Sequence, residues 1–132
     1  MKNLIILIIL VFSTAVNAQK KATDSCDASI KYTLYKENAH ASYYHDKFNG
    51  RKTASGKKFD NTKLTAAHKK FPFGTKLKIT NEKNNKSVIV EITDRGPFVN
   101  GREIDLSKKA FMDITSNKGD GVVYVKIEII ED

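Results

Sequence analysis

The chain has 132 residues and a formal net charge of +8, from 23 lysines and arginines against 15 aspartates and glutamates. This length suits one domain, and the single cysteine, Cys26, excludes an internal disulfide framework. The excess of positive charge favours a polyanionic partner. The competing interpretation is that surface lysines simply keep the protein soluble.

The N-terminal end has the three parts of a Sec-type signal peptide. Lys2 supplies the charged start, residues 4–12 form an unbroken apolar run, and Val16-Asn17-Ala18 offers small residues before a cut. The competing interpretation, a transmembrane anchor, needs about 20 apolar residues, more than this run provides. We therefore predict a signal peptide over residues 1–18, export to the periplasm or the outside, and no membrane anchor after cleavage.

The charge left after cleavage indicates a partner outside the cytoplasm. Because Lys2 is the only charged residue before Gln19, its removal lowers the net charge from +8 to +7. Polyanions met after export are cell-wall polymers and anionic lipid, whereas no Arg-rich helix or zinc-ligand spacing supports nucleic acid. Cys26 follows Thr23-Asp24-Ser25 rather than the apolar run. We expect an unlipidated thiol, free or paired with another chain, on an otherwise monomeric protein.

After the predicted signal peptide, the sequence predicts a flexible segment followed by short strands and tight turns. Residues 19–38 are polar and lack a strong period, so we expect a flexible lead-in with at most a short strand over 32–35. The domain is predicted to occupy residues 39–132. Its first expected elements are a strand over 41–44, turns at Asn49-Gly50 and Ser55-Gly56, and at most a helical turn over 64–69.

The second half of the domain alternates apolar and polar residues more clearly. Strands are predicted over 75–80 and 87–93, joined by a short polar hairpin connection. Ser107 is expected to cap a short helix over 108–114, and a last strand runs over 122–130. The side chains expected to face the core are Leu77, Ile79, Val88, Val90, Ile92, Ala110, Phe111, Ile114, Val123, Val125, Ile127 and Ile129.

These elements, about six short strands and one small helix, indicate a compact, mainly β domain. A small open sheet would leave its edge strands unpaired. A closed barrel is therefore the favoured architecture.

Two aspartates stand at the ends of one short connection in this domain. Asp94-Arg95-Gly96-Pro97-Phe98 leaves an apolar strand through a tight turn, and Ile104-Asp105-Leu106-Ser107 leads into the helix. Two carboxyl groups brought together by such a turn can have their pKa values pushed apart, which provides an acid and a base at neutral pH. The stretch therefore predicts a site for acid/base chemistry.

Further motifs surround this stretch. They are Ala41-Ser42-Tyr43-Tyr44, Gly50-Arg51-Lys52-Thr53-Ala54-Ser55-Gly56, Phe59-Asp60, Leu64-Thr65-Ala66-Ala67-His68, Pro72-Phe73-Gly74-Thr75 and Thr80-Asn81. Together with the two aspartate-containing blocks they resemble, in their order and spacing, the double-psi β-barrel domain of the rare lipoprotein A family, and the resemblance covers roughly residues 41–130. The resemblance implies a mainly β, six-stranded double-psi β-barrel with one or two short helices. It also implies a lyase of the lytic transglycosylase type, which cleaves peptidoglycan strands to anhydro-muramic ends without a metal or other cofactor.

Asp105 is the first candidate for the acid/base of such a reaction. By resemblance it matches the aspartate that related lytic barrels place at the end of this connection. Ile104 and Leu106 flank it, so its carboxyl is expected to be partly desolvated. The alternative is a structural carboxylate that favours the N-terminus of the following helix.

Three further side chains are candidates for the catalytic site. Asp94 would raise the pKa of Asp105 or stabilise an oxocarbenium-like state. The equal alternative is an ion pair with Arg95 or Arg102 that braces the turn. The resemblance also assigns Asp60 and His68 to the site, although a lone histidine is more often structural.

Six more side chains complete the predicted site as substrate contacts. Aromatic rings would stack on sugar rings or else pack in the barrel, and guanidinium groups would hold lactyl, stem-peptide or phosphate anions. They are Tyr43, Tyr44 and Phe98, and Arg51, Arg95 and Arg102.

One position departs from the family pattern. Related sequences carry a glutamate three residues before the aspartate that matches Asp60, whereas Gly56 is here followed by Lys57. Lysine cannot serve as a carboxylic acid. This leaves open a second function, a non-catalytic, expansin-like module that binds or loosens peptidoglycan. A third possibility is a protein-binding barrel such as an inhibitor, because a fold alone does not fix a function.

Overall fold

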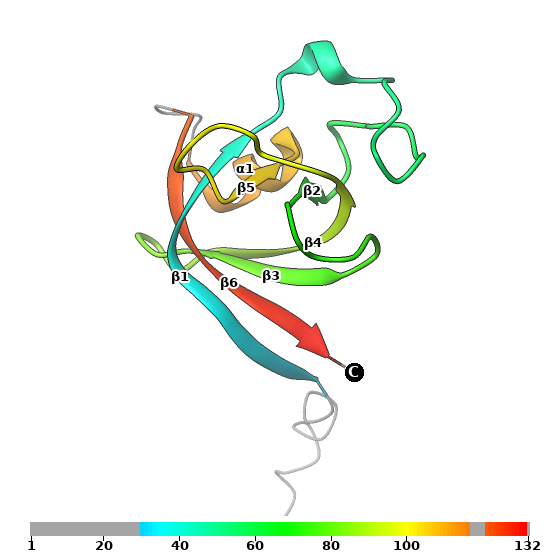
Figure 1. Ribbon diagram of the computed structural model, residues 1–132. Coiled ribbons are helices and arrows are strands. Elements are labelled where there is room, and N and C mark those ends of the chain that lie inside the picture. Colours follow the sequence, from blue (N-terminus) through cyan, green and yellow to red (C-terminus); the bar gives the residue numbers. More distant parts are fainter. Residues whose placement is uncertain (1–29, 117–120, 132) are drawn as a thin grey trace, which may run out of the picture.

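The structure is a computed structural model that describes residues 30–116 and 121–131 (Figure 1). The predicted signal peptide and Cys26 lie outside these residues. The strands are β1 (Lys31–Tyr43), β2 (Thr65–Ala67), β3 (Lys76–Asn81), β4 (Ser87–Asp94), β5 (Ile104–Leu106) and β6 (Val123–Glu131). The helices are the 3-10 helix η3 (Asp46–Phe48) and α1 (Lys108–Ile114). The strands close into a barrel in the order β1-β5-β2-β4-β3-β6, which confirms the predicted six-stranded barrel.

Strand pairing sets where the two aspartates of the connection lie. β5 runs parallel to β1 and antiparallel to β2, and its Asp105 is opposite Ser42 on one side and Ala67 on the other. β2 also pairs with β4, where Ala67 is opposite Asp94. Asp94 and Asp105 therefore flank the same residue of β2 from its two neighbouring strands.

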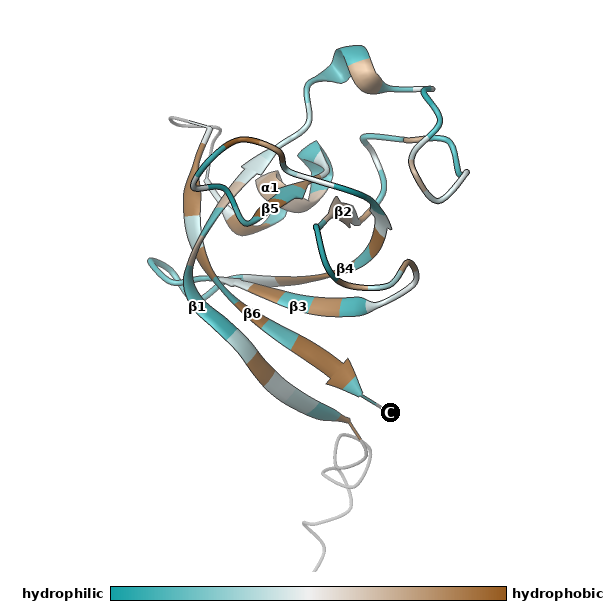
Figure 2. Cartoon of the chain, viewed as in Figure 1, coloured by the Kyte–Doolittle hydropathy of each residue, from teal (hydrophilic) through white to brown (hydrophobic). Residues whose placement is uncertain are grey.

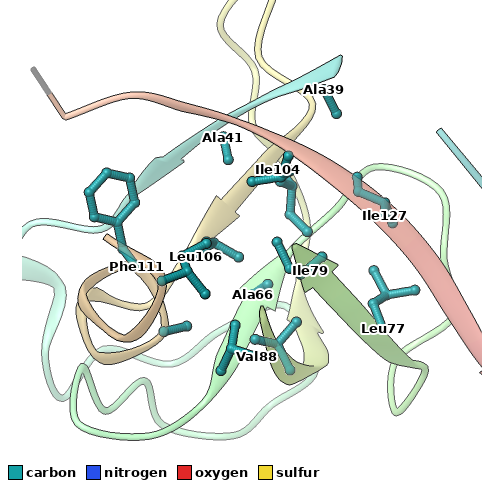
Figure 3. Close-up of a cluster of buried hydrophobic side chains, with 14 of the residues drawn as sticks. Ala39, Ala41, Ala66, Leu77, Ile79, Val88, Ile104, Leu106, Phe111 and Ile127 are labelled. Atoms are coloured by element: carbon teal, nitrogen blue, oxygen red, sulfur yellow. The ribbon is translucent and has the colours of Figure 1, made fainter. Parts of the chain in front are cut away.

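The core fills the barrel with alternate side chains of the long strands (Figure 3). Leu77 and Ile79 on β3 and Val125 and Ile127 on β6 are buried, while the residues between them are not, as the period of two predicts. The same alternation shows as brown and teal bands along β3 and β6 in Figure 2. Of the predicted core residues, Val123 and Ile129 are only half-buried, and they pack at the edge of the cluster.

Helix α1 lies against β1, β4 and β5 and matches the predicted range. Ser107 is its N-cap, and the Ser107 Oγ accepts a hydrogen bond from the Ala110 backbone N–H at 3.2 Å. Ala110, Phe111 and Ile114 are buried as predicted. Within residues 30–116 and 121–131, no helix has the length and apolar character needed to cross a membrane.

Three predictions about the elements are wrong. The flexible lead-in was placed over residues 19–38, but β1 already begins at Lys31 because Lys31–Leu34 pair with β6. Residues 64–69 form no helical turn, since Thr65–Ala67 is strand β2. β5 was not predicted. β2 and β5 have three residues each, too few to show a period, and partners on both sides hold them extended.

Candidate acid/base site

A cavity of about 410 Å³ lies where β4, β5 and the end of β1 meet. Both aspartates of the predicted acid/base site line it, and the segments that follow β1 and β4 form its walls. The remaining lining residues are Ser42, Tyr43, Tyr44, His45, Lys47, Phe48, Arg95, Gly96, Pro97, Phe98 and Arg102. The two carboxyl groups thus share one concave surface, as the sequence predicted.

Asp94, the last residue of β4, is held in place by three hydrogen bonds. Its Oδ1 accepts from the backbone N–H groups of Ala54 and Arg95, each at 2.9 Å, and its Oδ2 accepts from the Tyr44 hydroxyl at 2.6 Å. Burial, together with this hydrogen bond, raises the pKa of Tyr44 well above its ordinary value, so the phenol stays a donor. The orientation of Asp94 is therefore set by the surrounding loops.

No ion pair between Asp94 and a neighbouring arginine braces the turn within the described residues. The Arg95 guanidinium instead lies 4.1 Å from the centre of the Phe73 ring and donates to the His68 carbonyl at 3.3 Å. Arg102 pairs with Asp105 rather than with Asp94.

Asp105 has a much looser environment. Among the described residues its side chain has one polar partner, the Arg102 guanidinium, whose nitrogens lie 3.5 Å from each carboxyl oxygen. At that length the Asp105 Oδ1 and the Arg102 Nε are both buried without a hydrogen bond. Burial raises the pKa of Asp105, and the charge of Asp94 adds to this rise, while Arg102 and His40 oppose it less strongly.

The alternative role of Asp105, serving the helix N-terminus, finds no support in the hydrogen bonds. The first turn of α1 is satisfied by Ser107 Oγ on the Ala110 N–H and by Asn61, whose Oδ1 and carbonyl accept from Lys108 and Lys109. Asp105 therefore does not cap the helix, and it lines the cavity.

The other two predicted catalytic residues lie outside this cavity. The Asp60 Oδ1 accepts from the Thr62 N–H at 2.9 Å and from its hydroxyl at 2.6 Å. These hydrogen bonds lower the pKa of Asp60, as expected for a turn-forming carboxylate. Asp60 lines a neighbouring cavity instead.

His68 is buried, with 1 % of its surface exposed. Its Nδ1 accepts from the Lys70 backbone N–H at 3.1 Å, so the proton of the neutral ring is on Nε2, which lies 2.9 Å from the Glu103 Oε2. Burial lowers the pKa of His68. The ring therefore acts here as a hydrogen-bond donor inside the barrel wall.

Five of the six predicted substrate contacts line the cavity. They are Tyr43, Tyr44, Arg95, Phe98 and Arg102. Phe98 leaves 83 % of its surface exposed, which suits a ring that stacks on a ligand. Tyr43 also packs on Phe111, with ring centres 4.7 Å apart, so it supports the barrel as well.

Arg51 is the one predicted contact that does not line the cavity. Its guanidinium lies 5.4 Å from the centre of the Phe48 ring, and Phe48 is itself a lining residue. Arg51 therefore contacts a residue of the cavity lining without lining the cavity itself.

Two residues that hold the structure around the site together carried no signal in the sequence. Glu103 joins His68 to Lys36, whose Nζ is 3.0 Å from its Oε1. Asn61 is buried and donates from Nδ2 to the Tyr44 carbonyl and to the Asp46 Oδ1, which anchors the loop after β1 to the start of α1. Both act through contacts across long sequence separations, which no local pattern reveals. Among the described residues, no group of three or more His, Cys, Asp or Glu could hold a metal ion.

The known proteins that this chain resembles point to one family. The model of the family described as "Lytic transglycolase" matches residues 36–127. The endolytic peptidoglycan transglycosylase RlpA of Pasteurella multocida (strain Pm70) is 50% identical over 97 residues, covering 74% of this chain and 33% of the relative. The protein of the same name from Rickettsia felis is 46% identical over 99 residues, covering 73% of this chain and 43% of the relative. The chain thus spans less than half the length of these relatives.

Two solved structures are similar in fold. The Streptomyces papain inhibitor has a TM-score of 0.56 at 20% identity, covering 75% of this chain and 97% of that one. The apo expansin of Clavibacter michiganensis has a TM-score of 0.57 at 19% identity, covering 77% and 52% respectively. At these identities the likeness concerns the fold alone, and it confirms the predicted double-psi β-barrel.

Proposed function

The chain belongs to the lytic transglycolase family, and we propose that it is an exported enzyme that cleaves the glycan strands of peptidoglycan. The observation that carries the proposal is the cavity in which Asp94 and Asp105 meet. One carboxyl group there is fixed by three donors, and the other is desolvated with a raised pKa. The relatives named as peptidoglycan transglycosylases support the choice of substrate.

Asp105 acts in turn as acid and base. The reaction needs its carboxyl to hold a proton, which the raised pKa favours, and this proton goes to the glycosidic oxygen as the bond to the muramic C1 breaks. The resulting Asp105 carboxylate then takes the proton of the muramic C6 hydroxyl, whose oxygen bonds to C1 and closes the anhydro ring. Asp105 ends the cycle protonated, and no water is consumed.

Asp94 supplies the negative charge opposite the developing oxocarbenium ion. Its three hydrogen bonds keep the carboxylate in one place, so it need not reorganise as charge develops. Tyr44 and the Ala54 N–H are positioning groups that act through Asp94. Phe98 offers an exposed ring at the rim for a sugar, and Arg95 and Arg102 line the wall where anionic substituents would lie.

Export follows from the predicted signal peptide over residues 1–18 and agrees with a cell-wall substrate. We place the mature protein in the periplasm or outside the cell, associated with the wall. A monomer with no membrane anchor suffices for the proposed reaction, since both aspartates belong to one chain.

The test is incubation of the purified mature protein with isolated sacculi and with denuded glycan strands. We expect products with anhydro-muramic ends, detected by mass spectrometry. A lytic transglycosylase of known activity provides the positive control. If that enzyme releases anhydro products and this protein releases none from either substrate, the proposal is wrong.

A second candidate function is favoured by Lys57. Its Nζ lies 3.2 Å from the Glu91 Oε2, so the position where related sequences carry a glutamate holds a paired cation here. A protein that binds glycan without cutting it would sediment with insoluble peptidoglycan, less so at high salt, and would create no new chain ends in the same incubation.

A further inference from the structure

A further cavity, of about 280 Å³, lies next to the acid/base cavity along β1, and we call it the Tyr124 cavity. Ser42 and Asp105, which are opposite each other in the pairing of β1 with β5, line the acid/base cavity. His40 and Glu103 line the Tyr124 cavity, and the His40 carbonyl accepts from the Glu103 N–H at 2.8 Å. Residues two apart in a strand, such as His40 and Ser42, point to the same face and lie about 7 Å apart. Neighbouring sugars of one glycan chain can therefore reach both cavities.

Tyr124 gives this cavity an exposed aromatic ring. It is the partner of His40 where β6 runs beside β1 (Figure 1), and the two ring centres are 5.4 Å apart. The His40 ring supports the Tyr124 ring from one side, while 51% of the surface of Tyr124 remains exposed. A ring held in this way provides a flat apolar surface with a polar hydroxyl at its end. The C–H face of a sugar ring fits such a surface.

The polar groups of the Tyr124 cavity suit an uncharged, hydroxylated ligand. The Lys36 Nζ and the Glu103 Oε1 are paired at 3.0 Å, so the charges of these two lining residues largely offset each other. Among the described residues, neither the side-chain amide of Asn38 nor the buried His40 Nδ1 has a hydrogen-bond partner. Buried polar atoms are normally satisfied by a partner. Hydroxyl and acetamido groups of a sugar can supply these hydrogen bonds.

The chain segment between the two cavities leaves room for a ligand to pass. Gly101 and Glu103 line the Tyr124 cavity, and Arg102 between them lines the acid/base cavity. Gly101 is exposed, and a Cβ placed on it would meet no other atom within 4 Å. The surface at Gly101 is therefore open, and no side chain at this position separates the two cavities.

We propose that the Tyr124 cavity is an additional sugar subsite, at which a sugar further along the bound glycan stacks on Tyr124 and bonds to Asn38 and His40. This rests on the proposed function, because the subsite extends the binding of the strand that is cleaved at Asp94 and Asp105. The subsite makes affinity depend on the length of the glycan. Fragments long enough to fill both cavities bind more tightly than a single disaccharide.

The test measures the binding of soluble, denuded glycan fragments of one and of three disaccharide units. Isothermal titration calorimetry is carried out on the Asp105→Asn protein, in which the proposed reaction cannot consume the ligand, and mass spectrometry confirms the fragment length afterwards. Adding Tyr124→Ala should weaken the binding of the longer fragment about fivefold, as expected for the loss of one aromatic stacking contact. The affinity for the single disaccharide should stay unchanged, because this fragment fills only the acid/base cavity.

Two further variants serve as controls. Tyr124→Phe keeps the ring and should keep the affinity for the longer fragment. Tyr32→Ala removes another exposed tyrosine, which lines neither cavity, and it should leave both affinities unchanged. Unchanged binding of the longer fragment by Tyr124→Ala would overturn the subsite. An equal loss with the single disaccharide, or an equal loss in Tyr32→Ala, would also overturn it.

These outcomes are separate from the outcome for catalysis. If Tyr124→Ala loses affinity for the longer fragment but the wild type releases no anhydro products, the subsite is retained and the proposed reaction is lost. If the wild type releases anhydro products and Tyr124→Ala binds the longer fragment as tightly as its parent, the reaction is retained and the subsite is lost.

Discussion

Two carboxyl groups near the start of β5 lie two residues apart in the chain and have opposite environments. Glu103 receives the Lys36 ammonium at 3.0 Å and lies 2.9 Å from the His68 Nε2. Within the part of the chain that the structure describes, the Asp105 side chain has one polar partner, Arg102, at 3.5 Å. Their side chains are similarly shielded, with 21% and 16% of their surface exposed.

The pKa values of the two groups move in opposite directions. Burial alone would raise the pKa of Glu103, but the hydrogen bonds from Lys36 and His68 outweigh it, and the net shift is downward. Burial raises the pKa of Asp105, and the long contact to Arg102 does not cancel it. Burial and the quality of the partners together therefore separate a structural carboxylate from one suited to proton transfer.

Replacing Asp105 gives the largest expected effect. Asp105→Asn removes the transferable proton and should lower the rate of anhydro product formation by about a thousandfold or more. The matched control is Glu103→Gln, which should keep the activity and lower the free energy of unfolding by about 1–2 kcal/mol. Rates on glycan strands and urea denaturation measure both. Equal loss of activity in the two variants would mean that the comparison does not identify the acid.

Replacing Asp94 should have a smaller effect on the same reaction. Asp94→Asn keeps the shape but removes the charge that stabilises the oxocarbenium ion and helps to raise the pKa of Asp105. We expect the rate to fall roughly ten- to a hundredfold. Product release is measured at several pH values. A rate that stays at the wild-type level would assign Asp94 to bracing the turn alone.

Removing the partner of Glu103 should affect stability rather than chemistry. His68→Ala leaves the buried end of Glu103 without its donor and opens a small cavity, so the free energy of unfolding should fall by about 2–3 kcal/mol. His68→Gln, which can still donate, should recover part of this loss. The measurement is chemical denaturation, with activity expressed per folded molecule. Loss of activity in folded His68→Gln would place the histidine in the reaction after all.

The smallest expected effect is an opposite pH dependence of stability for the two carboxyls. Because the pKa of Glu103 is lowered, its ionised carboxylate adds to the free energy of unfolding above the ordinary pKa of 4.5. This addition is lost as pH falls through the folded-state pKa. Because the pKa of Asp105 is raised, its protonated carboxyl adds to the free energy of unfolding below the ordinary pKa of 3.8. This addition is lost as pH rises through the folded-state pKa. The advantage of the wild type over Glu103→Gln should therefore shrink in acid, whereas Asp105→Asn should be the more stable protein near neutral pH. Denaturation series from about pH 3 to 7, which include the ordinary pKa values of both groups, check both signs.

Local sequence patterns predicted the helices and strands that are determined by residues close together in the chain. The alternation along β3, β4 and β6 and the Ser107 cap of α1 were visible because each depends on residues close together in the chain. β2 and β5 were missed since their extended form comes from pairing with two neighbours each, and the first residues of β1 were missed because β6 holds them.

For the candidate site, the sequence by itself determined the family, the barrel and the meeting of Asp94 with Asp105, because both aspartates lie in motifs at the ends of one short connection. Only the tertiary structure decided that Asp60 and His68 face elsewhere, and that Glu103 rather than Asp105 receives the strong donors. The reason is physical: a motif fixes which groups are present, but a pKa and an orientation depend on desolvation and on donors such as Lys36, 67 positions away from Glu103.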